Sequence, residues 1–214
     1  MTLLVRSLAD QLVDVVRDRI LAGEVPADRP IKQDKLAAEL GVSKIPLREA
    51  LARLEEDGLI VSQPNRGFFL RPLTTAEAEE VYALRLKLEP DAMQVAATRA
   101  TEQERQAAIE ALNRVDGVVD AGDDEVGAYN RAFHMALVRP SRQNITIAII
   151  NRLQVMSERY VRKHLEPIGR DVRASEEHRQ MLEAWLVGGD IAGLARDHLG
   201  TTLAELRGQL AAEG

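Results

Sequence analysis

The sequence predicts a mainly α-helical protein made of two modules, a winged helix-turn-helix followed by an all-helical bundle. Aromatic residues make up only 3% of the 214 residues, while Ala, Leu, Val, Glu and Arg dominate, which favours helix over sheet. The strand-like runs are confined to "LIVSQPNRGFFLR". Charge is divided unevenly, because residues 1–73 carry 11 Lys and Arg against 11 Asp and Glu, whereas the remainder carries 17 against 23. Such asymmetry indicates modules with different partners.

The first module reads in order as three helices and a hairpin. Residues 5–22 repeat apolar side chains at helical spacing and stop at the Gly and Pro residues of "AGEVPADRP". "QDKLAAELGVSKIPLREALARLEEDGL" predicts two helices joined by a tight turn at Gly41-Val42, with Ser43 as N-cap of the second. Two β-type runs then flank a Pro-Asn-Arg-Gly turn. Residues 1–73 are therefore predicted to form a winged helix-turn-helix.

The second module, residues 74–214, is predicted to be all-α. Strand signal almost vanishes after Pro72, and apolar periodicity divides the rest into six helices separated by short polar breaks. We expect them at about 75–99, 102–121, 123–139, 142–165, 172–188 and 190–211. Residues 74–214 are therefore predicted to form the second domain.

Composition excludes several classes of site and location. The chain has no cysteine, so any metal must be held by histidine, carboxylate or amide ligands. The first residues, "MTLLVRSLADQLVDVV", place charges inside an apolar pattern, which is typical of an amphipathic helix and not of a signal peptide. No stretch approaches the length of a membrane span. We therefore expect a cytoplasmic protein without a membrane partner.

The second helix of a helix-turn-helix offers its N-terminal side chains to the major groove. Lys44 and Arg48 can donate to guanine or phosphate oxygens, and Ile45 can contact a thymine methyl group. The hairpin tip suits a wing on the DNA backbone or in the minor groove. The candidate DNA-binding residues are Ser43, Lys44, Ile45, Arg48, Arg66 and Gly67. The alternative from the pattern alone is a small helical domain with solvated surface charges.

Three of the four histidines are predicted to face the bundle interior. His134 in "YNRAFHMAL", His178 and His198 each lie three or four residues from apolar neighbours. His164 lies among charges near a helix end and is expected to be solvated. A single inward histidine is most simply a hydrogen-bonded core residue. Three facing one interior favour a shared divalent cation, because unpaired buried imidazoles are costly. Asn130, one turn before His134, could add an amide oxygen.

"KLAAELGVSKIPLREALARLEEDGLIVSQPNRGFFLRPL" resembles the winged helix of the GntR family of bacterial transcription regulators. "ALRLKLEPDAMQVAA", "NRAFHMAL" and "SEEHRQMLEAWLVGGDIAGLARDHL" resemble the FCD effector domain of its FadR subfamily, in the six-helix VanR-like form. Lys44 and Ile45 stand where that family usually has Arg and Thr, and Asp34 stands where some members have a DNA-contacting Arg. The departures imply a different or weaker operator preference.

The resemblance also implies a metal site in the bundle. The matching positions in FCD domains are an Asp and three His that bind a divalent metal at the base of an effector pocket. This chain has His134, His178 and His198, with Asn130 in place of the Asp. A neutral amide is a weaker ligand than a carboxylate and leaves the site one unit more positive. We therefore expect a looser site for zinc, nickel or manganese, and an anionic effector.

Arg85 is the candidate effector-binding residue. It falls on the buried stripe of its helix, where a guanidinium must be paired. Glu89 at i+4 could be that partner, or the carboxylate of a ligand could complete it. The sequence leaves both open.

The function predicted from these residues is a homodimeric, metabolite-responsive transcription regulator, most simply a repressor of a catabolic operon. It would bind a short palindromic operator and respond to a small carboxylate at the metal site. A metal-dependent enzyme is disfavoured because no carboxylate falls on the histidine stripes to act as a general base. The remaining alternative is a DNA-binding regulator whose bundle only dimerises, with the histidines as packing residues.

Overall fold

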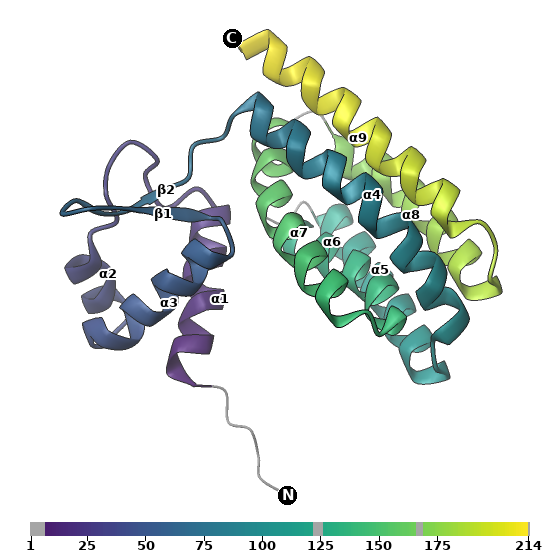
Figure 1. Ribbon diagram of the computed structural model, residues 1–214, viewed down its shortest axis with the longest axis horizontal. Coiled ribbons are helices and arrows are strands. Elements are labelled where there is room, and N and C mark those ends of the chain that lie inside the picture. The colour runs from purple at the N-terminus through teal and green to yellow at the C-terminus, as the bar shows by residue number, and fades with distance from the viewer. Residues whose placement is uncertain (1–6, 122–125, 166–168, 214) are drawn as a thin grey trace, which may run out of the picture. The chain divides into compact units, whose positions relative to one another are not determined.

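The computed structural model describes residues 7–121, 126–165 and 169–213. The chain separates into two compact units, residues 1–72 and 73–214. Figure 1 shows a small helical unit with a two-stranded hairpin and a larger unit of long helices. The predicted fold class is confirmed.

The first unit contains α1 (Leu8–Leu21), α2 (Gln33–Glu39), α3 (Lys44–Glu56), β1 (Ile60–Gln63) and β2 (Gly67–Leu70). A capping box between Ser7 and Asp10 begins α1, since each side chain bonds the other's backbone N–H. Gly41 adopts a φ of 65° in the turn between α2 and α3, a conformation that glycine tolerates at no steric cost. Residues 5 and 6 of the first predicted helix lie outside the described residues.

The apolar face of α3 holds the first unit together. Leu47, Leu51 and Leu54 are fully buried, and α3 packs on α1 and α2. The hairpin pairs Ile60 with Leu70 in an antiparallel register. This packing leaves the opposite face of α3 and the hairpin tip exposed. Ser43 precedes α3 with extended backbone angles, as predicted, but its side chain makes no capping hydrogen bond.

The second unit is an all-helical bundle. Its helices are α4 (Thr75–Arg99), α5 (Glu102–Ala121), α6 (Val126–Val138), α7 (Asn144–His164), α8 (Arg170–Val187) and α9 (Ile191–Glu213), with a short 3₁₀ turn η1 (Arg139–Ser141) after α6. Helix α4 runs beside α9 and packs on α7, while α5 packs on α6 and α8 (Figure 1). The six predicted helices are present within a few residues of their expected bounds, and predicted residues 123–125 lie outside the described part.

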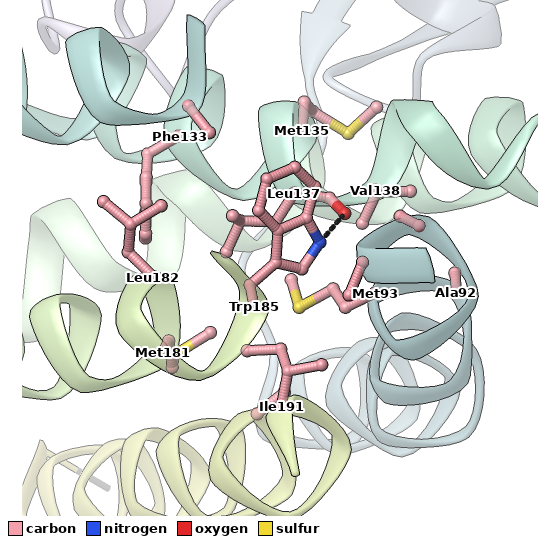
Figure 2. Close-up of a cluster of buried hydrophobic side chains, with 14 of the residues drawn as sticks. Ala92, Met93, Phe133, Met135, Leu137, Val138, Met181, Leu182, Trp185 and Ile191 are labelled. Carbon is pink, nitrogen blue, oxygen red and sulfur yellow. Dashed lines mark hydrogen bonds between the residues drawn. The ribbon is translucent and has the colours of Figure 1, made fainter. Parts of the chain in front are cut away.

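Trp185 anchors the core of the bundle. Its indole is fully buried between Met93, Leu137 and Ile191, so α8 is joined to α4, α6 and α9 (Figure 2). The indole N–H donates to the carbonyl of Leu137 at 3.1 Å, which satisfies the one polar atom of the ring. This packing fixes α6 and α8 relative to each other, and both helices carry an inward histidine.

Candidate metal centre and DNA-binding surface

The bundle brings the three predicted histidines together. His134 lies on α6, His178 on α8 and His198 on α9, with 1%, 2% and 7% of their surfaces exposed. One ligand nitrogen from each can be chosen so that all lie within 4.8 Å of one another. His134 Nε2 and His178 Nε2 are 3.3 Å apart. Each histidine is about one turn from a core residue, as Leu137 and Met181 illustrate, so core packing positions the cluster.

Electrostatics keep these imidazoles neutral. Burial lowers the pKa of all three histidines, and their mutual repulsion and nearby arginines lower the pKa of His134 further. A neutral imidazole has one nitrogen lone pair that can bind a metal. The cluster therefore presents three uncharged nitrogen donors at physiological pH.

Several polar atoms around the cluster are buried without a partner. His134 Nδ1, His178 Nδ1 and Asn130 Oδ1 form no hydrogen bond within the described part of the chain. All three residues line an interior cavity of about 50 Å3, large enough for a few water molecules or a small ligand. Asn130 thus lies at the same cavity as the histidines. Whether its amide binds a metal stays a prediction.

Arg85 pairs with Glu89. The guanidinium donates to both carboxylate oxygens at 2.6 and 3.2 Å, and also to Ser157 Oγ at 2.9 Å. Gln154 donates to the same carboxylate. Of the two partners that the sequence left open, the structure contains the intramolecular one. Arg85 still lines the cavity, beside the ring of Tyr82.

Two further arginines line the cavity, and sequence reasoning missed both. Arg170 is 2% exposed and contacts Glu177 at 2.6 Å, while Arg131 contacts Glu158 at 2.8 Å. Their partners lie 7 and 27 residues away, so no i+4 spacing signals the pairs. Each cavity arginine is thus already matched by a carboxylate.

Two expectations about the surroundings of the histidines are wrong. His164 is 3% exposed rather than solvated, because the end of α7 is covered and the following Leu165 is fully buried. Carboxylates also lie near the cluster, since Glu177 Oε2 is 2.6 Å from His198 Nδ1 and Glu89 Oε2 is 3.8 Å from His134 Nδ1. Periodicity within one helix cannot reveal neighbours from another helix, so the missing general base is not a valid argument against an enzyme.

The predicted DNA-binding residues lie on the exposed side of the first unit. The side chain of Lys44 is 63% exposed and Ile45 is 72% exposed at the N-terminal end of α3. Lys44, Arg48 and Gly67 line one groove of about 770 Å3 between α3 and the hairpin. Ser43 is exposed beside them.

The hairpin tip presents Arg66 and Gly67. Arg66 donates to Gln63 at 2.8 Å and lies over the ring of Phe69, so the hairpin orients its guanidinium. Gly67 has a φ of 91°, which a side chain would strain. Sequence reasoning missed an ion pair across the groove between Lys44 and Asp34.

Comparison with known proteins identifies both units. Residues 8–70 match the family described as bacterial regulatory proteins of the gntR family, and residues 80–199, more than half of the chain, match the FCD domain. No helix in the described ranges has the length and apolar character needed to cross a membrane.

Two curated relatives are regulators of operons. The Nta operon transcriptional regulator of Aminobacter aminovorans is 37% identical over 63% of this chain and 62% of that protein. The probable D-xylose utilization operon transcriptional repressor of Paenarthrobacter nicotinovorans is 29% identical over 86% of this chain and 80% of that protein. The chain spans less than two thirds of the length of the Aminobacter protein.

The fold has a solved counterpart. McbR/YncC of Escherichia coli superposes with a TM-score of 0.82 over 96% of this chain and 99% of that one, at 24% identity. The matched families and the named relatives are transcription regulators. This chain belongs to the GntR family of bacterial regulatory proteins, in the FadR-like subfamily whose second domain is an FCD domain.

Proposed function

We propose that this protein is a DNA-binding transcription regulator, with residues 1–73 as the DNA-binding domain and residues 74–214 as the effector-binding and dimerisation domain. The groove between α3 and the hairpin supports the first assignment, because Lys44 and Arg48 supply exposed cations there and Arg66 is exposed at the hairpin tip. Lys44 and Arg48 suit base edges or phosphates, and Ile45 suits a thymine methyl group. Ser43 and Gly67 are small, so they would allow the DNA backbone to approach this surface closely.

A divalent cation fits the histidine cluster. His134, His178 and His198 supply neutral nitrogen donors around a cavity that also holds the unpartnered oxygen of Asn130. Zinc, nickel and manganese are the candidates, since imidazole and amide oxygen suit such ions. When bound, the ion would supply positive charge and an open position for an oxygen ligand.

The effector that suits this site is a small carboxylate. The three cavity arginines are each paired with a glutamate, so the protein groups alone offer little net positive charge. The proposed cation supplies that charge, and Arg85, which lines the cavity, could orient the ligand. The cavity of about 50 Å3 restricts the effector to a small acid unless the bundle opens.

Two observations support the remaining parts of the proposal. A relative named as a sugar-utilization repressor suggests repression of a catabolic operon here.

Helix α7 exposes Ile145 and Ile149 one turn apart, at 81% and 44%, which suits a homodimer contact in the bundle. A two-fold dimer would read a short palindromic operator. Light scattering should show a dimer that Ile145→Glu weakens and Val187→Glu, at another exposed site, does not.

The observation that carries the proposal is the set of three buried, neutral histidines facing one cavity. The second candidate, a bundle that only dimerises, draws support from the 3.3 Å distance between His134 and His178, which one hydrogen bond could explain. As packing residues, however, they leave buried polar atoms unpaired at about 1–3 kcal/mol each.

The test titrates zinc, nickel, manganese and small organic acids against thermal stability, since only ligands of the native state raise the melting temperature. Wild type should respond to a metal, and then to an acid only when metal is present. His178→Ala should abolish both responses, while His164→Ala, at a buried histidine outside the cluster, should retain both. Binding to DNA selected from a random pool should then change with the stabilising acid. A wild type that responds to no metal would leave the histidines as core packing.

A further inference from the structure

His198 differs from the other two histidines in its second nitrogen. His198 Nδ1 lies 2.6 Å from Glu177 Oε2. By contrast, His134 Nδ1 and His178 Nδ1 have no hydrogen-bond partner among the described residues. A carboxylate accepts but does not donate, so this contact requires the proton of His198 to reside on Nδ1. Nε2 is then the nitrogen left with a lone pair for the cluster.

Glu177 is itself held by a buried arginine. Arg170 donates to both carboxylate oxygens, at 3.1 Å to Oε1 and 2.6 Å to Oε2. The same guanidinium donates to Thr202 Oγ1 at 3.1 Å, and Thr202 Oγ1 donates in turn to the carbonyl of His198 at 2.8 Å. Glu177, Arg170, Thr202 and His198 therefore close a ring of hydrogen bonds between α8 and α9. The ring fixes both the carboxylate and the imidazole that it contacts.

Solvent can also approach this ring through a groove separate from the interior cavity. An outer groove of about 150 Å3 is lined by Glu177 and His198, and the Glu177 side chain is 33% exposed. Without the carboxylate, water in this groove could donate to Nδ1 as readily as accept from it. The proton of His198 would then be free to move to Nε2, where it blocks metal binding.

We propose that Glu177 is a positioning residue for the metal centre, holding the proton of His198 on Nδ1 so that Nε2 faces the cavity as a ligand. The proposal rests on the metal site described under the proposed function. Carboxylates that orient a ligating histidine restrict its tautomer and its ring orientation and raise its basicity, and their loss typically reduces metal affinity 10–100-fold. His134 and His178 have no such carboxylate at hydrogen-bond distance in the described residues, so the effect should be specific to His198.

The first test reads the tautomer directly in metal-free protein. Long-range ¹H–¹⁵N NMR of the full chain should show His198 protonated on Nδ1 in wild type. Glu177→Gln replaces one acceptor oxygen by an NH₂ donor, so the Nε2-protonated form should become populated. An unchanged His198 tautomer in Glu177→Gln would overturn the proposal.

The second test measures nickel(II) and zinc(II) affinity by calorimetry. Glu177→Gln should weaken binding about 10–100-fold, and Glu177→Asp, which keeps the carboxylate, should recover part of the loss. Glu205→Gln is the matched control, because Glu205 lies 3.1 Å from Arg170 on its other side and forms no ion pair or hydrogen bond with His198 in the described part of the chain. Glu176→Gln makes the same charge change at a neighbouring exposed position.

The outcomes separate this proposal from the metal site itself. Loss confined to Glu177→Gln, with both controls near wild type, supports the positioning role. Equal loss in Glu205→Gln would assign the effect to general disruption around Arg170 and overturn the role. Normal nickel binding by Glu177→Gln overturns it while leaving the metal site intact. A wild type that binds neither ion overturns the metal site and this role together.

Discussion

The two units place their candidate functional residues in opposite environments. In the first unit Lys44 and Ile45 are 63% and 72% exposed, whereas in the bundle His134 and His178 are 1% and 2% exposed. Water and salt screen exposed charges, so each one contributes only modestly to stability or binding and depends little on any single neighbouring residue. Buried polar groups depend on every partner, because an unpaired one costs its full desolvation. The bundle should therefore respond strongly to single changes and to pH, and the DNA surface weakly.

The largest expected effect is the pH dependence of bundle stability in metal-free protein. Burial lowers the pKa of His134, His178 and His198 below the unfolded value of 6.5. Below pH 6.5 the unfolded chain therefore binds more protons than the folded protein, and the free energy of unfolding falls as pH falls. With three such groups, the free energy of unfolding changes by at most about 4 kcal/mol per pH unit.

Denaturant unfolding with a chelator, from pH 7.5 to pH 5, measures this slope. The stability should be nearly constant above pH 7 and decline below about 6.5. His178→Gln should retain the plateau and lose about a third of the slope, since one of three titrating groups is gone. Constant stability down to pH 5 would mean that the histidines are not held neutral in the fold.

The sequence predicts the local features of each unit better than the contacts between its helices. Periodicity and turn residues place the helices, because Gly41, Pro72 and the apolar stripes act locally. The inward histidines are also visible, since their neighbours lie one turn away. The partners of these residues are not visible. Glu177 reaches His198 across 21 positions, and although Glu89 was one of two candidate partners of Arg85, the contacts of this pair with Ser157 and Gln154 come from another helix.

His164 and Ser43 show the limit most clearly. His164 lies among charges in the sequence but is covered in the bundle, because burial depends on how α7 ends and not on the polarity of neighbouring residues. Ser43 occupies the expected place before α3, yet its hydroxyl makes no capping bond. Sequence position predicts where a helix begins, while the rotamer of one exposed side chain depends on local alternatives such as water.

The second prediction concerns Arg48, the exposed arginine one turn into α3. Arg48→Ala should weaken binding to selected DNA by about 1–3 kcal/mol and relax discrimination at one base position, if the guanidinium reads a guanine. Arg53→Ala is the control, because Arg53 lies on the same helix but pairs with Asp10 of α1. Fluorescence anisotropy on wild-type and single-mismatch duplexes measures both. Equal effects of the two substitutions would remove Arg48 from the base-reading surface.

A smaller effect is expected at Asn130, whose side-chain oxygen is buried at the cavity without a hydrogen-bond partner in the described chain. Asn130→Asp adds a negative oxygen ligand, so metal should bind about tenfold more tightly. The same change makes the site one unit less positive, so a carboxylate effector should bind more weakly. Calorimetry with metal and then with acid tests this opposition, and Asn130→Ala should not reproduce it. Parallel losses of both affinities would indicate simple destabilisation.

The smallest expected effect lies on the DNA surface, at the ion pair between Lys44 and Asp34. Both side chains are mostly exposed, at 63% and 77%, so the pair itself contributes at most about 1 kcal/mol. Asp34→Asn frees Lys44 and removes a negative charge from the groove that faces DNA. Affinity should rise less than about fivefold, and its salt dependence should steepen by up to about one unit if Lys44 then reaches a phosphate. Asp28→Asn removes the same charge at an exposed position outside that groove and should change neither quantity. Should both substitutions tighten binding equally, Asp34 acts only through net charge, and its pairing with Lys44 has no part in DNA recognition.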